Sequence, residues 1–135
     1  MTNKIQGITL ASILLLASAV PALAHHSFSA EFDAEHITTL NGTLTRVDWI
    51  NPHAYWYIDV KDDKGQMQHW SLEGYPPSEL RLAKINRDMV GKPGDTISVD
   101  VFPAKDGTKQ LAHIKTLRFS DGRQIDMWLK SDPNK

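Results

Sequence analysis

The strongest constraint on the fold of this chain is a two-residue alternation of apolar and polar side chains in short segments separated by turn residues. Residues 53–61 (HAYWYIDVK) show it most clearly. The side chains of that segment that fall on one face of an extended chain are Ala54, Trp56, Ile58 and Val60. Residues 62–65 (DDKG) are typical of a hairpin turn, so residues 67–74 are predicted to form the return strand. This periodicity predicts β-strands and not helices.

Further segments of the same kind extend the prediction to five strands. The expected strands cover residues 37–49, 53–61, 67–74, 96–102 and 110–119. One short helix is expected between the third and fourth strands, with Ser78 as its N-cap and an apolar stripe of Leu80, Leu82, Ala83 and Ile85. This order predicts a mainly β fold, a five-stranded OB-like barrel; the alternative is an open sandwich of two small sheets.

The domain organisation follows from the same segments. We expect a signal peptide at residues 1–24, an N-terminal extension at 25–36, the OB-like barrel at 37–125 and a C-terminal tail at 126–135. A chain of 135 residues is long enough for one hydrophobic core and too short for two domains of ordinary size.

The signal peptide is predicted from three features of the first residues. Lys4 supplies a positive charge, residues 8–20 are apolar and uncharged, and Ala22-Leu23-Ala24 is typical of a cleavage site. The apolar run is shorter than the roughly 20 residues that a membrane-spanning helix needs. We therefore expect a periplasmic or secreted protein whose mature chain begins at His25 and has no membrane span.

The hairpin register can be predicted from the apolar faces. Trp56 and Leu72 must share the core, as must Ile58 and Trp70, so the outward pairs are expected to be Tyr55 with Glu73, Tyr57 with Ser71 and Asp59 with His69. His53 is then a diagonal neighbour of Glu73, close enough for both to reach one ligand or ion. His69 is expected roughly 20 Å from His53 along the ladder, which excludes a shared metal.

Composition excludes several classes of protein. Lys and Arg number 15 against 16 Asp and Glu, so there is no basic excess for binding nucleic acid. The chain has no cysteine, which excludes disulfides, thiol nucleophiles and cysteine-ligated metal sites. A metal site must use nitrogen and oxygen donors.

The mature N-terminus is the most distinctive candidate site. After cleavage, the α-amine and the imidazole Nδ1 of His25 can chelate Cu(II), and His53 or His26 can supply a third nitrogen. Glu73 is the expected axial or outer carboxylate. Copper is the one cofactor that the residues suggest. His36, His69 and His113 are expected to be solvated surface side chains, and Tyr55 and Tyr57 to cover the outer face of the sheet or to form a stacking platform.

The motifs of the mature chain resemble those of a family of small exported bacterial proteins of unknown function. They are HHSF at 25–28, FD at 32–33, LNGT at 40–43, WINPH at 49–53, PGD at 93–95, PAKDG at 103–107 and DGR at 121–123. The resemblance implies export, a single β-rich domain and motif positions for His25, His26 and His53. It implies no activity. The chain departs from the family pattern at Lys84-Ile85, where Gly-Trp is usual.

Three functions are consistent with these observations. We predict a non-enzymatic binding domain of unidentified ligand that binds copper through the mature N-terminal histidine. One alternative is a copper-dependent oxidase or monooxygenase that uses a histidine brace. The other is a structural or partner-binding barrel without metal.

Overall fold

A computed structural model describes residues 28–129 of the chain. The expected signal peptide, His25 and His26 lie outside the described residues. The strands are β1 (Thr38–Asp48), β2 (Tyr55–Lys61), β3 (Met67–Glu73), β4 (Thr96–Pro103), β5 (Leu111–Phe119) and β6 (Gln124–Asp126). The helices are α2 (Phe28–Glu31) and α3 (Pro77–Leu82).

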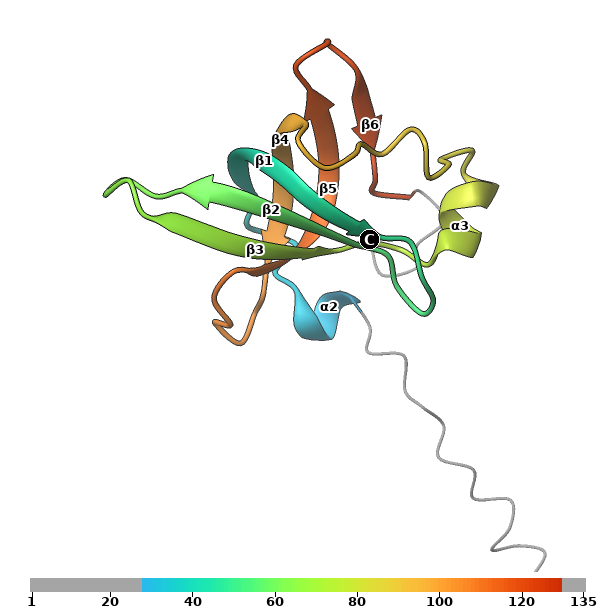
Figure 1. The fold of residues 1–135 in the computed structure, drawn as a ribbon. Helices are drawn as coiled ribbons and strands as arrows, with labels where there is room; N and C mark the ends of the chain where they lie inside the picture. Colours follow the sequence, from blue (N-terminus) through green and yellow to red (C-terminus); the bar gives the residue numbers. More distant parts are fainter. Residues whose placement is uncertain (1–27, 130–135) are drawn as a thin grey trace, which may run out of the picture.

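The strands form a closed barrel (Figure 1). Their order is β3-β2-β1-β4-β5-β6, and an additional parallel pairing of β3 with β5 closes the ring of five, with β6 added to the edge of β5. The mainly β, OB-like barrel with a short helix between its third and fourth strands is confirmed. The predicted hairpin register is also confirmed, including the pairs Trp56 with Leu72 and Tyr55 with Glu73.

The helix α3 differs from the prediction at both ends. It starts at Pro77 with Pro76 as its N-cap, so Ser78 lies inside the first turn and is not the cap. It ends at Leu82, because Lys84 adopts a left-handed conformation (φ 65°) that stops the helix. Leu82 is 82% exposed, so the expected apolar stripe does not face the core as a unit.

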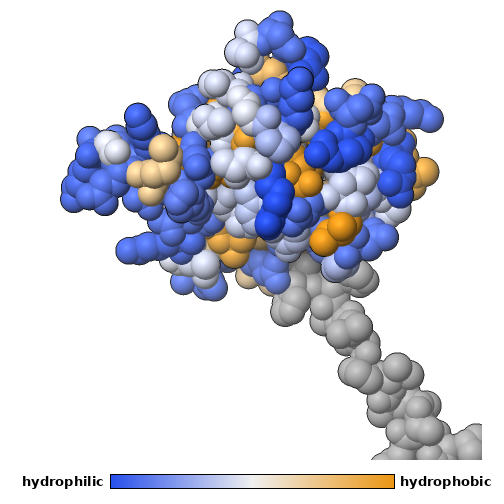
Figure 2. Space-filling model, in the orientation of Figure 1, coloured by the Kyte–Doolittle hydropathy of each residue, from blue (hydrophilic) through white to orange (hydrophobic). Residues whose placement is uncertain are grey.

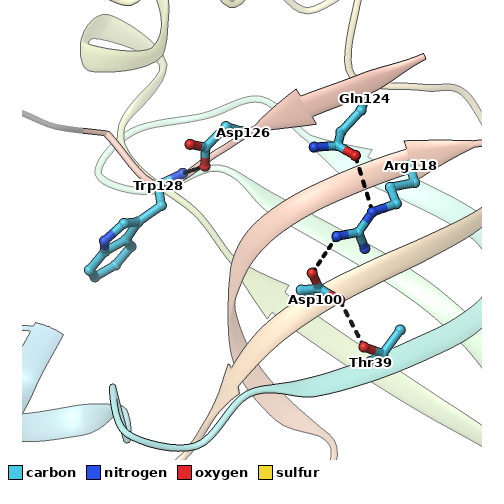
Figure 3. Close-up of polar contacts among 6 residues, drawn as sticks. All are labelled: Thr39, Asp100, Arg118, Gln124, Asp126 and Trp128. Carbon is cyan, nitrogen blue, oxygen red and sulfur yellow. Dashed lines mark hydrogen bonds and ion pairs between the residues drawn. The ribbon is translucent and has the colours of Figure 1, made fainter.

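The barrel interior contains the main hydrophobic core. Its largest fully buried side chains include Leu44, Trp56, Ile58, Leu72, Ile114 and Met127. Met127 and Leu129 belong to the segment expected as a tail, yet both are buried in this core. The carboxylate of Asp126 accepts a hydrogen bond from the backbone N–H of Trp128 (3.0 Å), which turns the chain back toward the barrel after β6 (Figure 3).

A second, smaller cluster lies between α2 and the barrel. Phe28 of α2 and Phe32, which follows the helix, cluster with Phe102 of β4, and Trp128 packs against the same group. The loop after β4 holds the helix: the Lys105 ammonium donates to the Ser29 carbonyl (2.8 Å), and the Lys105 N–H donates to the Glu31 carbonyl (2.8 Å). Figure 1 shows α2 beside this loop, at the end of the barrel away from the β5–β6 turn.

The surface is mostly hydrophilic. Figure 2 shows polar side chains over most of the face in view, with hydrophobic residues in small separate spots. Within residues 28–129, neither helix has the length and apolar character needed to cross a membrane.

Candidate functional site

The candidate site is built on the last paired residues of the β2–β3 hairpin. Just before β2 begins and just after β3 ends, the N–H of Ala54 donates to the Tyr75 carbonyl (3.3 Å) and the N–H of Gly74 donates to the Ala54 carbonyl (2.8 Å). These bonds continue the ladder beyond the strands and hold His53 beside Glu73. The predicted neighbourhood of His53 and Glu73 is therefore present.

Glu73 is the centre of the polar contacts at this rim. Its Oε1 lies 2.7 Å from His53 Nδ1, and its Oε2 accepts a hydrogen bond from the Tyr55 hydroxyl (3.1 Å). His53 Nδ1 also lies 3.1 Å from the carbonyl oxygen of Gly74. Both groups near Nδ1 are acceptors, so Nδ1 carries the proton and Nε2 is the nitrogen left to bind a ligand.

The ionisation of the three side chains reflects these contacts. The hydrogen bond to Glu73 raises the pKa of His53 above its usual value, against the effect of burial. Burial raises the pKa of Glu73, but the hydrogen bonds from His53 and Tyr55 outweigh it, so the pKa is lowered overall. Burial, with the adjacent Glu73 charge, raises the pKa of Tyr55 to about 12. At neutral pH, the rim holds an ionised Glu73 and a neutral Tyr55.

His113 departs from the sequence prediction. It was expected on the surface, but it is only 4% exposed. The parallel pairing of β3 with β5 sets it opposite Glu73, and the rings of Phe28 and Tyr75 pack edge-on against it at centroid distances of 5.1 and 5.2 Å. Because Phe28, Tyr75 and Trp128 pack around it, this side chain is buried although it does not point into the main core. His113 therefore belongs to the same rim as Glu73.

The other two histidines in the described part of the chain are exposed, as expected. The side chain of His69 is 78% exposed and lies 2.6 Å from Asp59, and His36 lies 2.7 Å from Asp33. Neither residue is part of the Glu73 rim.

Tyr55 and Tyr57 lie side by side on the outer face of the sheet, and Arg46 covers the Tyr57 ring. Tyr55 and Tyr57 stack with centroids 6.4 Å apart, and the Arg46 guanidinium lies 3.9 Å above the Tyr57 ring. Arg46 also lines an open groove of about 560 Å³ with Tyr57, Asp59, His69 and Trp70. Sequence reasoning missed Arg46, because the bulge between Leu44 and Arg46 changes the register of β1 there.

The metal-binding capacity of the described residues is limited. Within residues 28–129, no three His, Asp or Glu side chains are arranged to hold a metal ion. His53 and Glu73 bring together one imidazole and one carboxylate, while His25 and His26 lie outside the described residues. A complete metal site at this rim therefore requires donors from beyond residues 28–129.

Comparison with known proteins identifies one relationship. A family model described as "Family of unknown function (DUF6152)" matches residues 12–113. No curated protein and no solved structure matches the chain.

Proposed function

This chain belongs to that family of unknown function, and we propose from the chemistry of the Glu73 rim that it is an exported domain that binds Cu(II). The proposal includes cleavage after Ala24, which makes His25 the first residue. The donors are the amine and Nδ1 of His25 and the Nε2 of His53, with His26 as the alternative third nitrogen.

The observation that carries the proposal is the orientation of His53. Its Nδ1 is engaged by Glu73 and by the Gly74 carbonyl, and the remaining nitrogen, Nε2, belongs to a half-buried ring that cannot turn freely. Histidines that bind metals characteristically donate their other N–H to a carboxylate or carbonyl, which fixes the tautomer and the ring. Glu73 then acts as the carboxylate behind the ligand.

Chain length supports the participation of His25. The ring of Phe28 contacts His113, which pairs with Glu73, and Glu73 contacts His53. His25 is three positions before Phe28 in the sequence, and an extended chain of that length spans about 10 Å.

The donor set favours copper among the divalent metals. An amine and two imidazoles supply nitrogen donors suited to a square-planar Cu(II) site, and Cu(II) is bound most tightly of the first-row divalent ions by such donors. The chain has no cysteine, so no thiolate can act as a metal ligand.

Calorimetric titration with Cu(II) and a competing chelator tests the proposal. The protein should be prepared with His25 as its first residue and compared with one in which a methionine precedes His25. We expect the methionine to weaken binding at least about 100-fold, since it moves the amine out of the chelate ring. His53→Ala is expected to weaken binding, and Glu73→Gln to weaken it about 10- to 100-fold.

His69→Ala is the matched control, because His69 is also an imidazole beside a carboxylate but lies outside the Glu73 rim. Equal affinity of the two N-terminal forms, or no effect of His53→Ala, would contradict the copper proposal and favour a barrel without metal. The mass of the protein recovered after expression in its exported form tests cleavage after Ala24.

A further inference from the structure

The open groove on the outside of β1, β2 and β3 has no part in the Glu73 rim. We propose that this groove binds a neutral oligosaccharide, with Arg46 and Asp59 as the side chains that bind its hydroxyl groups. The groove has a volume of about 560 Å³ and is lined by residues of all three strands. It is a second site, and its ligand does not depend on copper binding.

The groove lies where the β2–β3 hairpin leaves the barrel wall. Residues 71–73 are the part of β3 that pairs with β5, and Figure 1 shows β2 and β3 extending together beyond that pairing. After the bulge in β1, Arg46 lies opposite Tyr57, and Ser71 pairs with Tyr57 from the other side. Three neighbouring strands thus place Arg46, Tyr57 and Ser71 in one row across the sheet.

Two side chains of the groove are held by neighbours and keep free hydrogen-bonding groups. The Arg46 guanidinium lies 3.9 Å from the centroid of the Tyr57 ring, and its Nε lies 3.1 Å from Asp48 Oδ1. Asp59 Oδ1 lies 2.6 Å from His69 Nδ1. Within residues 28–129, the terminal nitrogens of Arg46 and the Oδ2 of Asp59 have no hydrogen-bond partner. The groove therefore offers N–H donors from Arg46 and an acceptor from Asp59.

This combination suits a ligand rich in hydroxyl groups. A hydroxyl both donates and accepts hydrogen bonds, so neighbouring hydroxyls of a sugar can accept from the planar Arg46 fork and donate to Asp59. The Tyr57 ring adds apolar surface beside these polar groups, and sites for small organic ligands characteristically combine apolar surface with a few polar groups. A sugar ring, with its apolar C–H faces and polar edge, matches both.

The charges of the groove distinguish between two classes of ligand. Barrels of this type bind oligonucleotides or oligosaccharides on the face of their second and third strands. A single-stranded nucleic acid requires a positively charged groove along its phosphates. Here Asp48 pairs with Arg46. Asp59 pairs with His69, so no excess of positive charge remains. This balance disfavours a polyanion and favours a neutral sugar chain.

An NMR titration in the presence of a metal chelator tests the proposal separately from copper binding. The probes are neutral hexasaccharides of glucose, mannose, xylose and N-acetylglucosamine, compared with a hexasaccharide of galacturonic acid and a single-stranded thymidine oligonucleotide. We expect a neutral probe to shift the backbone amide signals of Arg46, Tyr57 and Ser71, with an affinity that added salt does not change. Tighter binding of either anionic probe, or no shift with any neutral probe, would overturn the inference.

Two substitutions of Arg46 test its part in binding. The Arg46 side chain is 60% exposed, so the folded barrel should tolerate both. Arg46→Ala is expected to weaken binding of the neutral probe about tenfold or more, because hydrogen bonds from a charged group are lost. Arg46→Lys keeps the charge without the planar fork and is expected to weaken binding similarly. Wild-type affinity in either variant would contradict the proposed role of Arg46.

Arg123→Ala is the matched control. Arg123 also lies over an aromatic ring, that of Phe119 (4.4 Å), and beside a carboxylate, that of Asp121 (2.7 Å), but it lies outside this groove. Its substitution is expected to leave the affinity for the neutral probe unchanged. An equal loss of affinity in Arg123→Ala and Arg46→Ala would place the sugar elsewhere and overturn the inference.

Discussion

At the scale of single residues, Tyr55 has a strongly perturbed ionisation. Its pKa of about 12 results from burial and from the neighbouring Glu73 carboxylate, both of which favour the neutral phenol. The folded-state pKa lies above the ordinary value of 10, so the stability that Tyr55 contributes is complete below pH 10. It is lost as the pH rises from 10 toward 12.

Absorbance of the phenolate during an alkaline titration measures this directly. We expect Tyr55 to ionise near pH 12 in the folded protein, and Tyr55→Phe to remove that transition. Tyr57→Phe serves as the control and should retain it. A late transition that survives Tyr55→Phe would contradict the assignment.

Gly42 is a second residue whose identity is dictated by its surroundings. It pairs with Val60 on one side and Ile97 on the other, and a Cβ at this position would collide with the Asp59 carbonyl oxygen. Because the obstructing atom belongs to the backbone of β2, the strands would have to separate. Gly42→Ala is expected to lower the free energy of unfolding by about 2 kcal/mol or more.

Denaturant unfolding tests this prediction, with Thr43→Ala as the neighbouring control. Thr43 is exposed, so its substitution should change the free energy of unfolding by less than about 1 kcal/mol. Similar effects of the two substitutions would show that β1 and β2 adjust to the added methyl group.

At the level of elements, a polar row joins four strands across the outside of the barrel. Asp100 of β4 accepts hydrogen bonds from the Thr39 hydroxyl of β1 (2.8 Å) and from Arg118 of β5 (2.6 Å), and Arg118 also donates to Gln124 of β6 (3.2 Å) (Figure 3). The bond from Arg118 lowers the pKa of Asp100 below its ordinary value of 3.8.

This row should contribute to stability only when Asp100 is ionised. Its lowered folded-state pKa means that the contribution is present above pH 3.8 and is lost as the pH falls below that value. Asp100→Asn is expected to cost about 0.5–1 kcal/mol at pH 7, since the Arg118 side chain is partly exposed to water. Thermal unfolding measured from pH 7 to pH 2 should show the difference from the wild type shrinking at the acid end; a constant difference would contradict this account.

The elements also show what the sequence can and cannot predict. The β2–β3 register was predictable because both strands alternate and a short turn joins them, which leaves one pairing that buries both apolar faces. The end of α3 was not predictable. Leu82 is apolar and fits a longer helix, and the helix stops only because the backbone of Lys84 is left-handed. His113 was misassigned because the rings that bury it, those of Phe28, Tyr75 and Trp128, are distant from it in sequence, and α2 is too short to show periodicity.

For the whole molecule, the segment after β6 is part of the folded domain. Met127 is fully buried in the main core, whereas Met67 in the β2–β3 hairpin is 46% exposed. Met127→Ala is therefore expected to lower the free energy of unfolding by about 2–5 kcal/mol.

Met67→Ala makes the same chemical change at an exposed position, and its free energy of unfolding should lie within about 0.5 kcal/mol of that of the wild type. Chemical denaturation of both variants provides the comparison. Equal stabilities would mean that the residues after β6 do not contribute to the core. The same distinction applies to the candidate site. His53 and Glu73 lie within one hairpin, so their closeness was predictable from the sequence. The position of α2 was not, because it depends on contacts between residues far apart in the chain.

The parallel pairing that closes the barrel also constrains how the chain folds. It sets residues 71–73 of β3 beside residues 111–113 of β5, with α3 and all of β4 in between. Among the strand pairings of the barrel wall, only that of β1 with β4 joins residues farther apart in sequence, so the loop-closure entropy of the β3–β5 contact must be overcome before the contact stabilises anything. The β2–β3 hairpin can form early, whereas the seam that joins Glu73 to His113 belongs to the slow, non-local part of folding. The ring of strands is thus expected to assemble in milliseconds to seconds, as in other small barrels.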